Sequence, residues 1–172
     1  MDVASQEIFE QLGLTVSDFT GRGLVPFADA DELETVQVDE DGRVHELVPA
    51  ACAAWEAMKQ AAQCDGVELY IVSAFRSIAR QAEIVRAKFL AGQGNDEIFA
   101  VSAPPGFSEH HTGRAIDVSA PGEAVLEAEF EQSSAFDWLE RNATRFGFTM
   151  TYPRDNTYGF SYEPWHWCYH GD

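Results

Sequence analysis

Apolar and polar residues follow one another along this 172-residue chain in short segments that predict both helices and strands. Good helix formers and amphipathic spacing predict helices over 5–12, 50–63, 78–91, 95–100 and 136–145, with Ser5 and Ser77 as N-caps of the first and third. Short runs rich in β-formers predict strands over 34–39, 43–48, 67–74, 115–118, 148–152 and 165–169. Because helices and strands do not alternate regularly, we expect one α+β domain, with helices flanking a small antiparallel sheet.

Turn signals separate these segments. The turn at 40–42, Glu-Asp-Gly, joins the first two strands into a hairpin, and Pro49 stands where the next helix begins. Two prolines and two glycines in 102–113 predict a loop between the central helices and the strand that starts at Ala115.

Charge narrows the classes of function. Eleven Lys and Arg residues stand against 29 Asp and Glu residues, for a formal net charge of −18. Nucleic-acid binding requires clustered basic residues, so we expect no nucleic-acid partner. Adhesion to anionic membranes is disfavoured for the same reason, and no segment approaches the roughly 20 apolar residues of a spanning helix, so no membrane insertion is expected. We expect a monomer.

Cysteine usage bears on the compartment. Cys52, Cys64 and Cys168 cannot all pair with one another and form no CxxC motif, which favours a reducing compartment. The acidic, polar N-terminus does not resemble a signal peptide. The sequence therefore favours the cytoplasm, and a trimmed signal peptide would instead place the protein in the periplasm or outside the cell.

Two segments carry candidate metal ligands. In SEHHTGRAID (108–117), two adjacent histidines precede a strand whose alternation separates Asp117 from Ile116 and Val118. In EPWHW (163–167), extended backbone places His166 opposite the two tryptophans, with Glu163 just before the strand. Imidazole and carboxylate are both zinc ligands. The alternatives are a turn-capping aspartate, a surface histidine and a purely aromatic core strand.

A third segment, SAFRS (73–77), places Arg76 where a buried strand passes into a capped helix. A guanidinium there can bind a carboxylate or an oxyanion; the alternative is an ordinary surface ion pair. Taken with the other two segments, His110, Asp117 and His166 make three zinc ligands and leave a fourth position for water, the arrangement of catalytic zinc. Glu163 then serves as general base and Arg76 as the positive group for developing charge.

These segments resemble the motifs of the VanY-type zinc D-alanyl-D-alanine carboxypeptidases. SEHHTGRAID matches SxHxxGxAxD, EPWHW matches ExWH, and SAFRS with Gln81 matches SxxRS…Q, in family order. The resemblance implies a zinc peptidase domain sharing the fold of the hedgehog signalling domain and D-Ala-D-Ala dipeptidases, with one zinc in a cleft over the sheet. It implies a family core over 47–170, preceded by an extension over 1–46 with a short helix and a hairpin. It also implies that Gln81 and Ser108, like Arg76, face the substrate.

Two positions depart from the family pattern. His111 stands where many relatives carry glutamine or another polar residue, and Cys168 stands where many carry arginine. We expect His111 to point away from the metal or to support it from behind, and Cys168 to be a small buried hydrophobe. A structural zinc site closed by His111 or Cys168 as fourth ligand is the alternative.

The predicted function is removal of the terminal D-alanine from a peptidoglycan stem peptide. Alternatives are a related dipeptidase or endopeptidase acting on wall fragments, and a non-catalytic zinc module that binds a peptide. The free carboxylate of the substrate requires a cation, and the sequence offers Arg76 or Arg114 for this purpose.

Overall fold

The centre of the fold is a four-stranded sheet in a computed structural model that describes residues 3–171. Its strands are β3 (Tyr70–Ser73), β4 (Ala115–Ser119), β5 (Phe148–Met150) and β6 (His166–Tyr169). The spatial order is β3-β4-β6-β5, and every neighbouring pair is antiparallel. The predicted α+β class with a small antiparallel sheet is confirmed.

A separate hairpin pairs β1 (Glu34–Val38) with β2 (Val44–Leu47). Gly42 closes its turn with a φ of 85°, a conformation that glycine adopts without the clash of a side chain. The chain passes from β2 directly into the first long helix, and both strands of the hairpin contact that helix. The predicted turn at 40–42 is confirmed, since the N–H of Gly42 donates to the carbonyl oxygen of Asp39.

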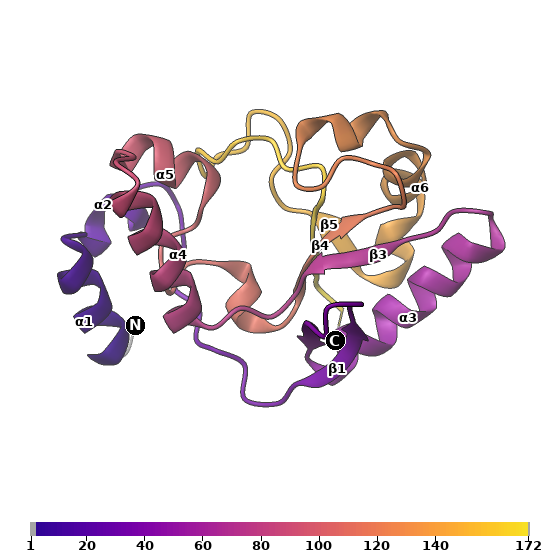
Figure 1. The fold of residues 1–172 in the computed structure, drawn as a ribbon, viewed down its shortest axis with the longest axis horizontal. Helices are drawn as coiled ribbons and strands as arrows, with labels where there is room; N and C mark the ends of the chain where they lie inside the picture. Colours follow the sequence, from indigo (N-terminus) through magenta and orange to yellow (C-terminus); the bar gives the residue numbers. More distant parts are fainter. Residues whose placement is uncertain (1–2, 172) are drawn as a thin grey trace.

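The helices form two groups (Figure 1). Near the sheet lie α3 (Pro49–Cys64) and α6 (Ser134–Asn142), and at the other end of the molecule lie α1 (Val3–Leu12), α2 (Val16–Thr20), α4 (Ile78–Leu90) and α5 (Asn95–Val101). Short 3₁₀ helices cover η1 (Glu109–Thr112), η2 (Ala128–Gln132) and η3 (Ala143–Phe146). None of the described helices combines the length and the apolar character that a membrane span requires.

Each group of helices has its own apolar core. The larger core joins the sheet to α3 and α6 through residues such as Trp55, Ile116 and Leu139. The smaller core joins α1, α2, α4 and α5 mainly through aromatic rings, including Phe19 and Phe107, whose centroids lie 6.1 Å apart. The central loops lie between these two close-packed cores, which hold them in place. The candidate site lies among these loops.

Several local predictions need correction. The first helix begins at Val3, so Ser5 lies inside it and is not its N-cap. The five-residue helix α2 was not predicted, because so short a segment shows no helical period. The last predicted helix begins at Ser134, where the Ser133 hydroxyl accepts the N–H of Phe136. Ser77 does cap α4, since its Oγ atom accepts the N–H of Arg80.

Candidate metal centre

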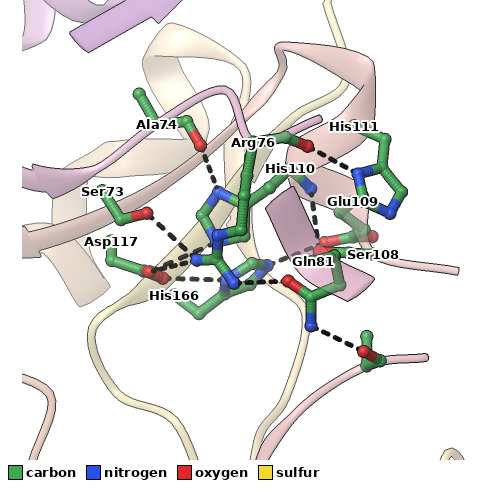
Figure 2. Close-up of polar contacts among 11 residues, drawn as sticks. Ser73, Ala74, Arg76, Gln81, Ser108, Glu109, His110, His111, Asp117 and His166 are labelled. Atoms are coloured by element: carbon green, nitrogen blue, oxygen red, sulfur yellow. Dashed lines mark hydrogen bonds and ion pairs between the residues drawn. The ribbon is translucent and has the colours of Figure 1, made fainter. Parts of the chain in front are cut away.

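Three side chains that could bind a metal ion meet beside the sheet: His110 from η1, Asp117 from β4 and His166 from β6 (Figure 2). One ligand atom from each lies within 4.8 Å of the others, and the three residues are 4%, 4% and 3% exposed. Asp117 and His166 are direct partners across the antiparallel β4–β6 pair, which fixes their separation.

Strand alternation explains why these polar side chains share one face. Ile116 and Val118 enter the larger core, so Asp117 between them points to the opposite side. Trp165 and Trp167 pack on the same core, and His166 between them also points away from it. The alternation predicted for both strands is confirmed, and the core residues hold the two ligands in register.

The backbone carbonyl of Ala74 orients the ring of His110. Its Nδ1 atom lies 2.7 Å from the carbonyl oxygen of Ala74, and its Nε2 atom lies 3.2 Å from Oδ2 of Asp117. A carbonyl only accepts, so Nδ1 carries the hydrogen and donates it to Ala74. Nε2 is therefore left with its lone pair directed toward Asp117, as a metal ligand requires.

The ring of His166 is held by two carboxylates. Its Nδ1 atom lies 3.0 Å from Oδ1 of Asp117, and its Nε2 atom lies 2.9 Å from Oε2 of Glu109. The hydroxyl of Thr151 donates to the same Glu109 oxygen at 2.7 Å. Burial by itself lowers the pKa of His166, but the hydrogen bonds to Asp117 and Glu109 outweigh burial and raise this pKa to about 10.

The charges of the cluster suit a cation. Burial by itself raises the pKa of Asp117, but the charge and hydrogen bonds of His110 and His166 lower it well below the ordinary range. Asp117 is therefore an anion between the imidazole of His110 and the imidazolium of His166, whose Nδ1 proton a metal ion would displace. Two imidazole nitrogens and a carboxylate oxygen, each held in place by the protein, form a donor set that fits zinc.

His111 and Cys168 lie outside this cluster. The Nδ1 atom of His111 donates to the carbonyl oxygen of Arg76 at 2.6 Å, and its Nε2 atom accepts the N–H of Gly106 at 3.0 Å. Both ring nitrogens of His111 are thus engaged with backbone, and burial lowers its pKa to about 4, so the ring is neutral. Cys168 is buried on β6, and neither residue joins the three candidate ligands among the residues that the structure describes.

Arg76 lies against the metal cluster (Figure 2). One guanidinium nitrogen lies 3.0 Å from the Ser73 hydroxyl and 3.7 Å from Oδ2 of Asp117, and another donates to Oε1 of Gln81 at 2.9 Å. The amide nitrogen of Gln81 donates to the carbonyl of Ala103 at 2.6 Å. Gln81 is therefore buried behind Arg76 and orients it.

Ser108 and Glu163 line the same cleft as the cluster, a cavity of about 860 Å³. The Ser108 hydroxyl accepts the backbone N–H of His110 at 3.4 Å, so it also shapes the turn that carries this ligand. Burial raises the pKa of the Glu163 carboxyl group to about 7, although the charges of His166 and Arg76 act in the opposite direction. A carboxyl group that titrates near neutrality suits proton transfer.

The structure places at the site two residues that the sequence analysis did not single out, and it places a third, expected there, elsewhere. Glu109, next to a ligand in the sequence, reaches the second histidine, and Lys88 lines the cleft. Arg114, one of two cations expected to bind the substrate carboxylate, lies elsewhere: it donates to the carbonyl of Gly171 at 3.0 Å and stacks over Tyr169. Tertiary contacts place these side chains, so no local sequence pattern reveals them.

Comparison with known proteins extends the picture. The family model for VanY, D-alanyl-D-alanine carboxypeptidase, matches residues 44–172. A D-alanyl-D-alanine carboxypeptidase from Enterococcus faecalis is 36% identical over 121 residues, covering 64% of this chain and 43% of the relative. The chain thus matches less than half the length of that relative.

Solved structures of similar fold point the same way. VanYB in complex with D-alanine-D-alanine aligns with a TM-score of 0.67 at 31% identity, covering 86% of this chain and 82% of that one. A VanY D,D-pentapeptidase variant in complex with Zn(II) aligns with a TM-score of 0.66 at 31% identity, covering 86% and 83%. The LdcB LD-carboxypeptidase aligns with a TM-score of 0.68 at 30% identity, covering 85% and 66%. Because the family model matches residues 44–172, which are most of this chain, the chain belongs to the VanY D-alanyl-D-alanine carboxypeptidase family.

Proposed function

We propose that this protein is a zinc-dependent carboxypeptidase that hydrolyses the terminal D-alanine of peptidoglycan stem peptides, with one zinc held by His110, Asp117 and His166. The observation that carries the proposal is the convergence of these three donors, within 4.8 Å of one another, in a cleft that Glu163 and Arg76 also line. A closed structural site has no use for either of the last two residues.

Zinc, when bound, supplies a Lewis acid that polarises the scissile carbonyl and favours deprotonation of water. Glu163 accepts the proton of the attacking water, because its pKa of about 7 lets it be ionised and still reprotonate easily. The same carboxyl group then delivers that proton to the leaving amine. One residue thereby serves as base in the first half of the reaction and as acid in the second.

Arg76 stabilises the negative charge that develops on the carbonyl oxygen. Ser73 and Gln81 fix its guanidinium, so no reorientation is needed when the charge appears. Burial lowers the pKa of Arg76 and the charges of Asp117 and Glu163 raise it, and a guanidinium stays protonated in either case. Gln81 contributes by holding Arg76, and Ser108 contributes a hydroxyl on the cleft wall.

The partner is a peptide, and we propose that the protein acts on it as a monomer. Related specificities, namely dipeptidase, endopeptidase and L,D-carboxypeptidase activity, differ in which peptide ends the cleft accepts. A second class of function is a non-catalytic zinc module that binds peptide. Glu163 beside the three ligands favours catalysis over the binding module, because binding does not require a proton acceptor at that position.

The test is hydrolysis of diacetyl-L-lysyl-D-alanyl-D-alanine by the purified protein. We expect release of one D-alanine per peptide, loss of activity with a chelator and recovery with one equivalent of zinc. Release of the D-alanyl-D-alanine dipeptide would indicate the dipeptidase, and cleavage only of a peptide ending in a single D-alanine after an L-residue would indicate the L,D-enzyme. Peptide binding without any cleavage would favour the binding module.

A further inference from the structure

Lys88 is one of only two lysines in the chain, and it lies on the wall of the cleft. Arg80, Ile84 and Lys88 follow one another at intervals of four residues on α4, so they form one helix face directed into the cleft. Lys88 lies about 12 Å along the helix axis from Arg80, at 1.5 Å per residue. It therefore extends the polar wall of the cleft beyond the metal cluster.

The Lys88 ammonium group has a neutral partner. Its Nζ atom donates to the Ser102 hydroxyl at 2.7 Å, and Ser102 lines the same cleft. Among the residues whose side chains the structure describes, no carboxylate forms an ion pair with Lys88 within 4.0 Å. An ammonium group has three donors, so two remain after the bond to Ser102. The charges of Glu163 and Glu97 raise the pKa of Lys88, but neither carboxylate lies within ion-pair distance of it, in a chain of net charge −18.

The other cations are less suited to bind a substrate anion. Arg76 already faces Asp117 and Gln81, and the charges it stabilises lie at the metal cluster. Arg80 pairs with Glu83 at the exposed rim, and Arg43 is exposed there as well, where ion pairs contribute little. Arg114 contacts Gly171 and Tyr169. Lys88 is half-buried, and burial lowers its pKa, so an anionic ligand would relieve the cost of desolvating its charge.

We propose that Lys88, together with the Ser102 hydroxyl, forms a subsite that binds a free carboxylate of the peptide. This inference rests on the proposed function, since it takes the cleft to be the place where the peptide lies. The carboxylate has two sources: the C-terminus of the residue that leaves, or an α-carboxylate left free by a γ-linked glutamyl residue farther along the stem. Both offer two oxygens to the ammonium and the hydroxyl, which is the charge-assisted geometry that strengthens such bonds.

The test is calorimetric binding of two peptides to the zinc-loaded protein, on a Glu163→Gln background so that the peptide is not consumed. Diacetyl-L-lysyl-D-alanyl-D-alanine carries only its C-terminal carboxylate, and the same peptide extended by γ-D-glutamate carries a second one. The variants are Lys88→Met, Lys88→Arg and Ser102→Ala, and the matched control is Lys59→Met on α3, away from the cleft.

If Lys88 binds the C-terminus, Lys88→Met lowers the affinity for both peptides by about 10-fold to 100-fold. If Lys88 binds the glutamyl carboxylate, Lys88→Met lowers only the affinity for the extended peptide, by the same factor. In either case Lys88→Arg restores most of the affinity, Ser102→Ala has a smaller effect, and Lys59→Met has none. Unchanged affinity for both peptides in Lys88→Met overturns the subsite, as does the absence of binding to the parent.

Thermal stability and turnover distinguish a binding role of Lys88 from a structural one. A purely structural bond between Lys88 and Ser102 predicts equal losses of thermal stability in Lys88→Met and Ser102→Ala, with no change in affinity, and this result also overturns the subsite. Turnover by the parent protein is measured separately. Binding that depends on Lys88 without any turnover would reject the proposed peptidase and keep the subsite. Turnover with binding unaffected by Lys88→Met would support the peptidase and reject the subsite.

Discussion

The Nε2 atom of His166 lies 2.9 Å from Oε2 of Glu109, on the side of the ring opposite to Asp117. A metal ion would displace the proton on Nδ1, and this pairing would then keep the remaining ring hydrogen on Nε2. Glu109 is itself held by the hydroxyl of Thr151 at 2.7 Å. The protein thus fixes the tautomer of one ligand through a carboxylate that does not itself belong to the ligand cluster.

Replacing Glu109 by Gln should weaken zinc binding by about 10-fold to 100-fold, since carboxylates behind ligating histidines typically contribute this much. The amide keeps the size of the side chain but lacks the charge that raises the basicity of His166. Competition with a chromophoric chelator measures the affinity. The control is Glu129→Gln on the exposed surface of η2, which should bind zinc as the parent does. Equal affinity in Glu109→Gln would show that the negative charge of Glu109 does not contribute to zinc binding.

Glu163→Gln should retain zinc and lose about 10²-fold to 10⁴-fold in kcat, because the amide cannot accept the proton of the attacking water. Zinc content is measured by elemental analysis and turnover by released D-alanine. His166→Ala is the contrasting variant and should lose metal and activity together. Turnover by Glu163→Gln at the parent rate would assign the base to another group.

Glu163→Gln should also stabilise the metal-free protein at pH 8 and much less at pH 5. Burial raises the pKa of Glu163 to about 7, so the folded state holds this proton more tightly than the unfolded state does. The resulting stabilisation is complete below the unfolded pKa and is lost as the pH rises through 7. An ionised carboxylate then remains in the cleft, at a cost on the order of 1–3 kcal/mol.

Urea unfolding of both metal-free proteins at the two pH values measures this effect. The gain in free energy of unfolding at pH 8 should exceed the gain at pH 5. The same gain at both values would mean that the carboxyl group does not titrate between them.

Gly113→Ala should destabilise the fold by roughly 2–4 kcal/mol, the sum of a left-handed backbone and local overpacking. Gly113 ends η1 with a φ of 63°, and a Cβ atom there would lie 2.9 Å from Cδ2 of Leu33 and 3.1 Å from Cγ1 of Val48. Gly92→Ala is the matched control, because its φ is 87° but nothing lies within 4 Å of its Cβ position. Chemical unfolding should show the smaller loss in Gly92→Ala, and equal losses would rule out the steric contribution.

The sequence by itself determined on which face of its strand each of two candidate metal donors, Asp117 and His166, lies. Alternation in 115–118 and 165–167 separates apolar residues for the core from Asp117 and His166 on the other face, and this pattern is visible without any partner strand. Most predicted helices and strands are present within a few residues, because their caps and turns are local signals. Ser77 and Gly42 are examples. The short helices α2, η1 and η2 escaped prediction, since they are too brief to show a period, and η3 was merged with α6 into one predicted helix over 136–145.

The tertiary structure alone decided which side chains support the donors and which cations face the cleft. Glu109 and His166 are 57 residues apart in sequence, and the rings of His110 and His111 bond to backbone carbonyls of Ala74 and Arg76. Arg114, within the motif in sequence, lies away from the cleft, while Lys88 on a distant helix lines it. The physical reason is that local spacing fixes the face on which a side chain lies, whereas the pairing of β4 with β6 and the packing of α4 fix what that face meets.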